Sequence, residues 1–405
     1  SSTKLAAVCK ACGIQIPELF LPAPDIDLTR FAVVACDQFT SEPEYWQETA
    51  DIVGSAPSAF NLVLPEYFLE HPGDIPVENR IESINTAMRE YLQKEILQSI
   101  GTAAVVLKRT LPGGKNRLGL VLAIDLEQYD YTPGNKKLIR ASEGTVLDRI
   151  PPRVAIRRDA PLELPHVQLL IDDFEHAVIE PLFESVEQQD EPLYNFELMQ
   201  GGGHLTGYKI DVADKNLLTA LSNLSNLESY RRDGMLFAVG DGNHSLATAK
   251  THYENNKAAF GPNHPARYAL VEIINIHDSG LEFEPIHRVL FNIEPEFFRR
   301  SAVAYFGADA LISDTSEALP ADPALLPTAV ANPDGTLTLP VLQPDGCSTL
   351  QLAKPNGGSL LAAERVTGFI DLLVKEHGAR VDYIHGSAAM LSLAAAGASG
   401  LLLPV

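Results

Sequence analysis

The sequence predicts an α/β (α+β) protein in which helices flank mixed β-sheets. Apolar runs of strand length recur along the chain, and segments with apolar residues at helical spacing lie between many of them. Glycine-rich turns join two pairs of adjacent runs, so we expect antiparallel hairpins from 103–110 with 117–125 and from 194–199 with 204–210. The long segment 77–101 has the periodicity of an amphipathic helix.

Composition limits the classes of function. The net charge is −22, whereas binding to a nucleic-acid backbone requires a basic surface, so we expect no nucleic-acid partner. The chain has no run of about 18 apolar residues and no N-terminal signal pattern, which predicts a cytoplasmic protein without membrane contact. Four cysteines do not make a disulfide framework. A small phosphorylated ligand stays compatible with this charge, because it needs only a local positive pocket.

The domain organisation follows from a change in composition. We expect a main α/β body over residues 1–293, a smaller appended α/β unit over 294–365, and a C-terminal segment, 366–405, that returns to the main body. The middle region is rich in Ala, Pro and Asp, and its short strands are separated by Pro-Asp-Gly turns. The pattern does not predict an oligomeric state.

The stretch 235–253 is the strongest functional signal. Its apolar start predicts a strand, Gly240 to Asn243 form a turn, and a helix is expected from His244. Free backbone N–H groups at such a helix start favour an anion, and the glycines Gly240 and Gly242 allow close approach of a ligand. Asp241 is a polar group on the same turn. An ordinary helix start with an Asp/Asn turn explains the spacing as well, and spacing alone favours it.

A second strand–loop–helix is expected near the N-terminus. The run 30–35 predicts a strand, and a helix should begin near residue 42. Asp37 and Gln38 stand between them, where a ligand-facing carboxylate and amide would stand. A loop carboxylate satisfied by backbone N–H groups is an equally good interpretation.

Arginines gather in the segment 138–159 of this acidic chain. Arg140 and Arg153 are suited to bind phosphate or carboxylate groups, and Glu143 and Thr145 lie between them as candidate substrate contacts. A solvated surface whose charges pair with one another is the competing interpretation, and this stretch alone slightly favours it.

Histidines also stand near the ends of later predicted strands. His287 and Arg288 follow a proline, a plausible anion site, although such a pair more often lies at the rim of a site. His385 follows the predicted strand 380–383.

Five motifs in order make the chain resemble the family called domain of unknown function 1015. The resemblance extends from about residue 17 to the last predicted strand. The motifs are DQFTSEPEYW at 37–46, IRASEGTVLDRIPPR at 139–153, GDGNHS at 240–245, EPIHR at 284–288 and YIHG at 383–386.

The central motif departs from the usual pattern of that family, which is Ala-Asp-Gly-His-His-Arg. Asn243 and Ser245 stand where the first His and the Arg are usual, so Arg288, Arg140 or Arg153 would have to supply the positive charge. The loop around Asp37 also differs from the usual Pro-Pro-Tyr-Asp, although its aspartate matches. The family motif is in turn similar to a turn of the sulfiredoxin/ParB-like fold, to which an archaeal free-serine kinase is similar.

This resemblance implies a sulfiredoxin/ParB-like core and a nucleotide-dependent kinase, using ATP or ADP with Mg²⁺, that acts on a free hydroxy amino acid such as serine. The open alternatives are a non-catalytic regulatory protein that binds a nucleotide or phosphorylated metabolite, and, ranked lowest because no local ligand spacing supports a metal site, a metal-dependent hydrolase. The candidate catalytic residues are Asp37, Asp241, His244 and His287; the candidate phosphate or nucleotide ligands are Gly240, Gly242, Asn243, Ser245, Arg288, Arg140 and Arg153; the candidate substrate contacts are Gln38, Glu143, Thr145 and His385.

Overall fold

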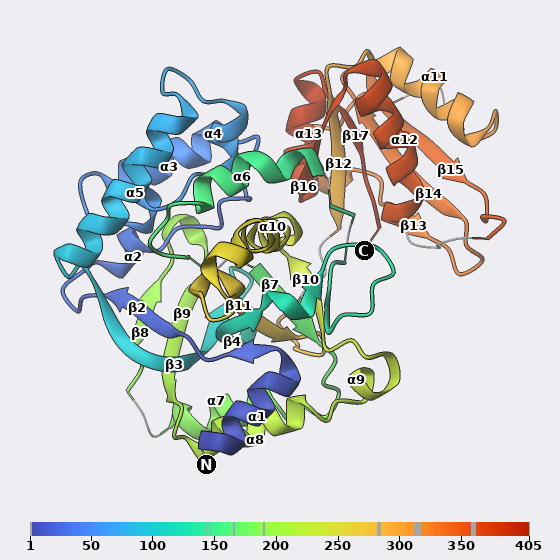
Figure 1. The fold of residues 1–405 in the computed structure, drawn as a ribbon. Helices are drawn as coiled ribbons and strands as arrows, with labels where there is room; N and C mark the ends of the chain where they lie inside the picture. The colour runs from blue at the N-terminus through green and yellow to red at the C-terminus, as the bar shows by residue number, and fades with distance from the viewer. Residues whose placement is uncertain are drawn as a thin grey trace. The chain divides into compact units, whose positions relative to one another are not determined.

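The computed structural model describes residues 2–142, 144–145, 147–164, 167–188, 191–281, 285–311, 317–357 and 362–404. The chain divides into two compact units, Ser1–Leu281 and Glu282–Val405, and each has its own sheet and its own apolar core (Figure 1).

One mixed sheet runs through the first unit in the order β5-β6-β10-β7-β11-β4-β3-β9-β8, with β1 paired to β4 and β2 to β3. The pairs β5–β6, β6–β10 and β7–β11 are parallel, whereas the hairpins β3–β4 and β8–β9 are antiparallel as predicted. The α/β prediction with mixed sheets is therefore confirmed. The strands are β1 (Ile14–Gln15), β2 (Glu18–Pro22), β3 (Leu97–Thr110), β4 (Asn116–Asp125), β5 (Tyr129–Asp130), β6 (Ile139–Arg140), β7 (Val167–Ile171), β8 (Tyr194–Glu197), β9 (His204–Asp211), β10 (Phe237–Asp241) and β11 (Tyr268–Asn275).

Strand alternation gives this sheet one apolar face and one face on which polar and apolar side chains are mixed. Val167, Val271 and Leu122 are register partners across β7, β11 and β4, and they belong to the main core together with residues of the helices α1, α7 and α8. These helices lie together on one side of the sheet in Figure 1. The next row, Gln168 and Glu272, points to the opposite face. The α-helices of this unit are α1 (Ser2–Cys12), α2 (Leu28–Phe31), α3 (Pro43–Val53), α4 (Glu66–Glu70), α5 (Val77–Gln93), α6 (Ile150–Arg157), α7 (Ile179–Glu187), α8 (Lys215–Leu224), α9 (Glu228–Asp233) and α10 (Asn243–Phe260).

A second, smaller core joins residues of α2, α5 and α6. It corrects the predicted strand at 30–35, because the chain there forms the short helix α2 and then continues without regular structure. The Asp27 carboxylate caps this helix by accepting a hydrogen bond of 3.1 Å from the Thr29 N–H, and Phe31 is buried in the small core. The apolar run therefore packs against helices instead of pairing as a strand.

The second unit contains an antiparallel sheet in the order β13-β14-β17-β12-β16, with β15 paired to β14. The strands of the 366–405 segment lie in this sheet, because β16 pairs with β12, and β17 with both β12 and β14. The sequence analysis placed β12 in the main body, whereas the first unit ends at Leu281, so the boundary predicted at residue 293 lies too late and the C-terminal segment belongs to the second unit. The elements are β12 (Ile286–Phe291), α11 (Pro295–Phe306), β13 (Val330–Ala331), β14 (Leu337–Gln343), β15 (Gly346–Leu352), α12 (Ala362–His377), β16 (Arg380–His385), α13 (Ser387–Ala395) and β17 (Ser399–Leu401).

Candidate functional site

The turn between β10 and α10 is built as the sequence predicts, with the helix starting one residue earlier. β10 ends at Asp241 after an irregularity in its pairing with β7, and α10 begins at Asn243. Gly242 is the N-cap residue with a φ of 92°, which L side chains rarely adopt. A Cβ at this position would stand 3.0 Å from Cγ2 of Val167. Glycine is therefore required twice here, for its backbone conformation and for its close approach to β7.

The loop after α2 is joined to this turn. Gln38 donates from its side-chain amide to Oδ2 of Asp241 over 3.5 Å. The loop is held by its neighbours, because the Cys36 carbonyl accepts the Glu66 N–H at 2.8 Å and the Phe39 carbonyl accepts the indole N–H of Trp46 at 3.0 Å. The loop after α2 and the turn between β10 and α10 are therefore in direct contact.

Asp37 carries a carboxylate with one unsatisfied oxygen and a raised pKa. Its Oδ1 is buried and has no hydrogen-bond partner among the residues that the structure describes. Burial, and secondly the neighbouring Glu66 carboxylate, raise the pKa of Asp37 to about 6. A hydrogen bond from the backbone of Asp37, then one from Gln38 and the charge of Arg153, act in the opposite direction. A carboxyl group with this pKa exchanges protons readily near neutral pH.

Two arginines border the same cluster. Arg153 donates from Nε to Oε1 of Glu66 at 2.9 Å and from Nη1 to the Arg149 carbonyl at 2.6 Å. Burial, followed by the charges of Arg149 and Arg153, lowers the pKa of His244 to about 4. The His244 imidazole is therefore neutral at pH 7, so it acts there through hydrogen bonds and not through positive charge.

The segment after β6 meets the start of α10. Asn243 accepts a hydrogen bond from the Ser142 N–H and donates one to the Ser142 hydroxyl, both at 3.2 Å. Thr145 has a buried hydroxyl with no hydrogen-bond partner within the described part of the chain. Glu143 lies outside the described residues.

Arg140 is engaged at another place. It donates from Nε to the Lys137 carbonyl at 2.8 Å and from Nη2 to the Asp233 carbonyl at 2.9 Å, at the end of α9. These bonds hold the β5–β6 connection and α9 together, so the structure gives Arg140 a packing role.

Three other candidates lie in the second unit. His287 is buried inside β12, where its Nδ1 accepts the Leu403 N–H at 3.0 Å, and burial lowers its pKa to about 4. Arg288 donates to the Ile286 carbonyl at 2.7 Å, and its guanidinium carbon lies 4.5 Å from the centroid of the Tyr383 ring. His385 is exposed at the end of β16, opposite Ile286. The Arg288–Tyr383 contact joins β12 to β16, and the His287–Leu403 hydrogen bond joins β12 to the residues after β17.

The sequence analysis missed Glu66, Arg149 and Ser142. Arg149 and Ser142 stand in the arginine-rich segment that it singled out, but Glu66 begins a five-residue helix, which has no sequence signal of function. Glu66 could be found only through its contact with Arg153, 87 positions away.

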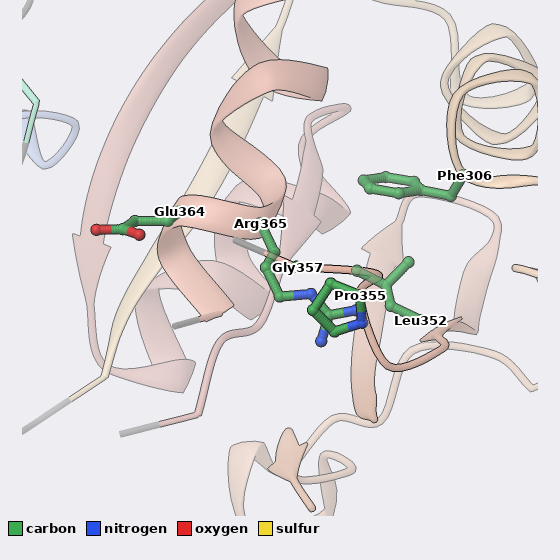
Figure 2. A pocket seen from close by; sticks show the side chains of 6 residues that line it. All are labelled: Phe306, Leu352, Pro355, Gly357, Glu364 and Arg365. Carbon is green, nitrogen blue, oxygen red and sulfur yellow. The ribbon is translucent and has the colours of Figure 1, made fainter. Parts of the chain in front are cut away.

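An open hollow of about 440 Å³ lies in the second unit and contains none of the candidates. In Figure 2 the Arg365 guanidinium lies against Pro355, whereas Glu364 points away. Arg365 donates to the carbonyls of Gly335, at 2.7 Å, and Ala353, so the backbone already engages its donors. The hollow is lined by Phe306, Leu352, Pro355, Gly357, Glu364 and Arg365.

The described residues contain neither a cluster of metal-ligand side chains nor a membrane-spanning helix. No group of three or more His, Cys, Asp or Glu side chains is arranged there to hold a metal ion. None of the helices found there is both long and apolar enough to span a membrane.

Comparison with known proteins identifies the family but no characterised relative. The family described as "Protein of unknown function (DUF1015)" matches residues 20–363, most of the chain. No curated protein and no solved structure matches, so the likeness to the sulfiredoxin/ParB-like fold stays a prediction. The matched residues include four of the five motifs, whereas YIHG at 383–386 lies beyond them. Because the match covers most of the chain, the chain belongs to the DUF1015 family of proteins of unknown function.

Proposed function

We propose that this protein is a nucleotide-dependent phosphotransferase that phosphorylates the hydroxyl group of a small molecule, with free serine as the first acceptor to test. The observation that carries the proposal is the hydrogen bond between Gln38 and Asp241, because it brings the Asp37 loop to the start of α10. Phosphoryl transfer depends mainly on positioning and on neutralisation of charge, and this cluster contains groups for both.

Asp37 is the proposed general base. Its pKa of about 6 leaves the carboxylate largely ionised at pH 7 to 8, yet basic enough to accept a proton from an acceptor hydroxyl. Its buried Oδ1, without a hydrogen-bond partner among the described residues, is the atom that would receive this proton. His244 is neutral at this pH and would orient the phosphate or the acceptor by a hydrogen bond.

The residues present fit a magnesium–nucleotide complex. Mg²⁺ in such sites is held by one or two carboxylates together with substrate phosphates, and Asp241 is the carboxylate at the turn. The start of α10, whose N-cap Gly242 makes no side-chain cap, and Arg149 beside it would hold the phosphates. When bound, ATP or ADP with Mg²⁺ supplies the phosphoryl group.

A specific contact favours the non-catalytic alternative. Arg153 already pairs with Glu66, which reduces the positive charge available to neutralise a phosphoryl group during transfer, a requirement that binding alone does not have. A regulatory protein that binds a nucleotide or phosphorylated metabolite without transfer would use the same turn.

A phosphotransfer assay with three variants separates these functions. Purified protein is given ATP, ADP or pyrophosphate with Mg²⁺ and L-serine or related hydroxy compounds, and phosphorylated product is measured. Asp37→Asn should abolish transfer, whereas Asp51→Asn, an exposed carboxylate of α3, serves as the matched control. A nucleotide-dependent rise in melting temperature that is lost in His244→Ala places the phosphate site at the turn.

Each outcome has a clear meaning. Nucleotide binding without transfer to any acceptor supports the regulatory protein. Transfer that survives Asp37→Asn removes Asp37 as the base. No transfer and no thermal shift with any nucleotide contradicts the phosphotransferase and a nucleotide-binding regulatory protein.

A further inference from the structure

A row of polar residues crosses the mixed face of the main sheet, starting at the candidate site. Asp241 of β10 is the register partner of Gln168 of β7, and Gln168 is the partner of Glu272 of β11. Register partners on adjacent strands point to the same face. Gln168 also forms a hydrogen bond with the Glu272 carboxylate. The row thus leads from the turn to the middle of the sheet.

Two glycines make space on this face for side chains that lie flat. A Cβ at Gly119 of β4 would stand 2.8 Å from Cγ of Glu272, and a Cβ at Gly207 of β9 would stand 2.6 Å from the Tyr194 hydroxyl. Gly119 and Gly207 are both partners of Leu107 on β3, so they stand in one row. Glu272 and Tyr194 therefore reach over the sheet from opposite sides. Burial, and secondly the Glu272 charge, raise the pKa of Tyr194.

Two arginines face each other at the end of this row. Arg109 and Arg117 are directly opposed on the antiparallel strands β3 and β4, an arrangement that is unfavourable for like charges. Each acts electrostatically on Glu272, whose single carboxylate neutralises only one of them. Arg109 also donates to the Gly202 carbonyl at 3.1 Å. Without a further anion the cluster holds an excess positive charge.

The unsatisfied atoms of this cluster are of two kinds. The Nε–H groups of Arg109 and Arg117 are buried donors, and Oε1 of Glu272 is a buried acceptor, and none has a hydrogen-bond partner within the described residues. Buried polar atoms of this type are unfavourable unless something pairs with them. A single ligand that pairs with both kinds of atom would offer an anionic acceptor to the arginines and a hydrogen-bond donor to Glu272.

We propose that the cluster of Arg109, Arg117 and Glu272 binds the head group of a free α-amino acid. The arginines would hold the carboxylate, because guanidinium groups match it in geometry and charge. Glu272 would accept hydrogen bonds from the ammonium group. A dicarboxylate would meet repulsion from Glu272, and a simple amine would leave both arginines unpaired. The inference deepens the proposed function, since this amino acid is then its acceptor.

Binding measured by calorimetry tests the inference without any transfer. L-serine, glycolate and ethanolamine share a hydroxyl group, but glycolate lacks the ammonium group and ethanolamine lacks the carboxylate. The wild type should bind L-serine at least about tenfold more tightly than either analogue, as expected when a buried polar group loses its partner. Equal binding of the three, or no binding of L-serine, overturns the inference.

Substitutions at Glu272 and Arg117 test which residue binds the ammonium group and which binds the carboxylate. Glu272→Gln should weaken L-serine about tenfold and leave glycolate nearly unchanged, whereas Arg117→Met should weaken both and Arg117→Lys should restore part of the loss. Lys108→Met is the matched control, because Lys108 lies on the other face of β3 and pairs with Glu187. Melting temperatures establish that each variant is folded. If Glu272→Gln weakens the binding of L-serine and of glycolate equally, Glu272 does not bind the ammonium group.

Measurements of serine binding and of phosphoryl transfer test the inference and the proposed function independently of each other. Asp37→Asn should keep serine binding while it loses transfer. Serine binding that depends on Glu272, without transfer from any donor, leaves the inference standing and removes the phosphotransferase. Transfer to serine with an unchanged KM in Glu272→Gln keeps the phosphotransferase and overturns the inference.

Discussion

His244 and His287 give a comparison between the two units. Burial is the first cause of the lowered pKa in both, and each value is about 4. Their surroundings differ, because His287 accepts a backbone N–H inside a sheet, whereas His244 stands at a helix start in the same cluster as Asp37. A lowered histidine pKa alone therefore does not distinguish a functional site from a structural one.

The Asp37 carboxylate distinguishes the region around His244 from the region around His287. Asp37 has a raised pKa and a buried oxygen without a partner in the described chain, so its ionised form destabilises the folded protein. The neutral His287 imidazole has a hydrogen-bond partner, and this form stabilises the folded protein. We therefore expect the two regions to respond in opposite directions to substitution and to acid.

The largest expected effect is that of Asp37→Asn. If the protein is a phosphotransferase, transfer should fall at least about 100-fold, because the proposed general base is removed. The free energy of unfolding at pH 7.5 should rise by about 1–3 kcal/mol, because the unfavourable buried charge is lost. Assays and urea denaturation of the same preparation measure both. If Asp37→Asn is less stable than the wild type, the ionised Asp37 carboxylate does not destabilise the folded protein.

Gly242→Ala should distort the turn without altering any charge. Its φ of 92° is strained for alanine, and the added Cβ meets Val167, so we expect a loss of roughly 2–3 kcal/mol. Gly234→Ala is the control, since Gly234 is also left-handed but no atom lies closer than 3.8 Å to its Cβ position. Urea midpoints should show the larger loss at Gly242. Equal losses would attribute the effect to backbone conformation alone.

The acid response tests His287. Its folded pKa lies below the unfolded value, so the stability it contributes is present above about pH 6.5 and is lost as pH falls toward 4. Between pH 7 and pH 5 this loss amounts to about 2 kcal/mol. His287→Gln keeps an acceptor for the Leu403 N–H but does not titrate, so denaturation at the two pH values should show less acid sensitivity. An unchanged acid response would assign the loss to other groups.

The smallest expected effect concerns Glu66. Its charge is the second cause of the raised pKa of Asp37, so Glu66→Gln should lower that pKa. The acid limb of the pH profile of kcat/KM should then move down by about one pH unit. His287→Gln should leave this limb unchanged. A shift toward higher pH would show that the loss of the Arg153–Glu66 pair dominates.

Local patterns predicted the hairpins and the turn at Gly242, because their turn residues and strand periods are encoded in neighbouring positions. The predicted strand at 30–35 was wrong, since the capping by Asp27 and the burial of Phe31 in a helical core override an apolar run. The roles of Glu66 and of the Arg109–Glu272 cluster depend on contacts between distant segments. No pattern in one sequence predicts such contacts.

The chain contains a single tryptophan, Trp46, which is buried and bonded to the Phe39 carbonyl. Phe39 has a φ of 51° and stacks on Tyr45 with 3.7 Å between the ring centroids, so the loop before α3 has a defined shape around this indole. The loop includes Asp37 and Gln38. Intrinsic fluorescence excited at the indole is therefore a label-free optical reporter, read from one site, of any rearrangement of that loop when a ligand binds.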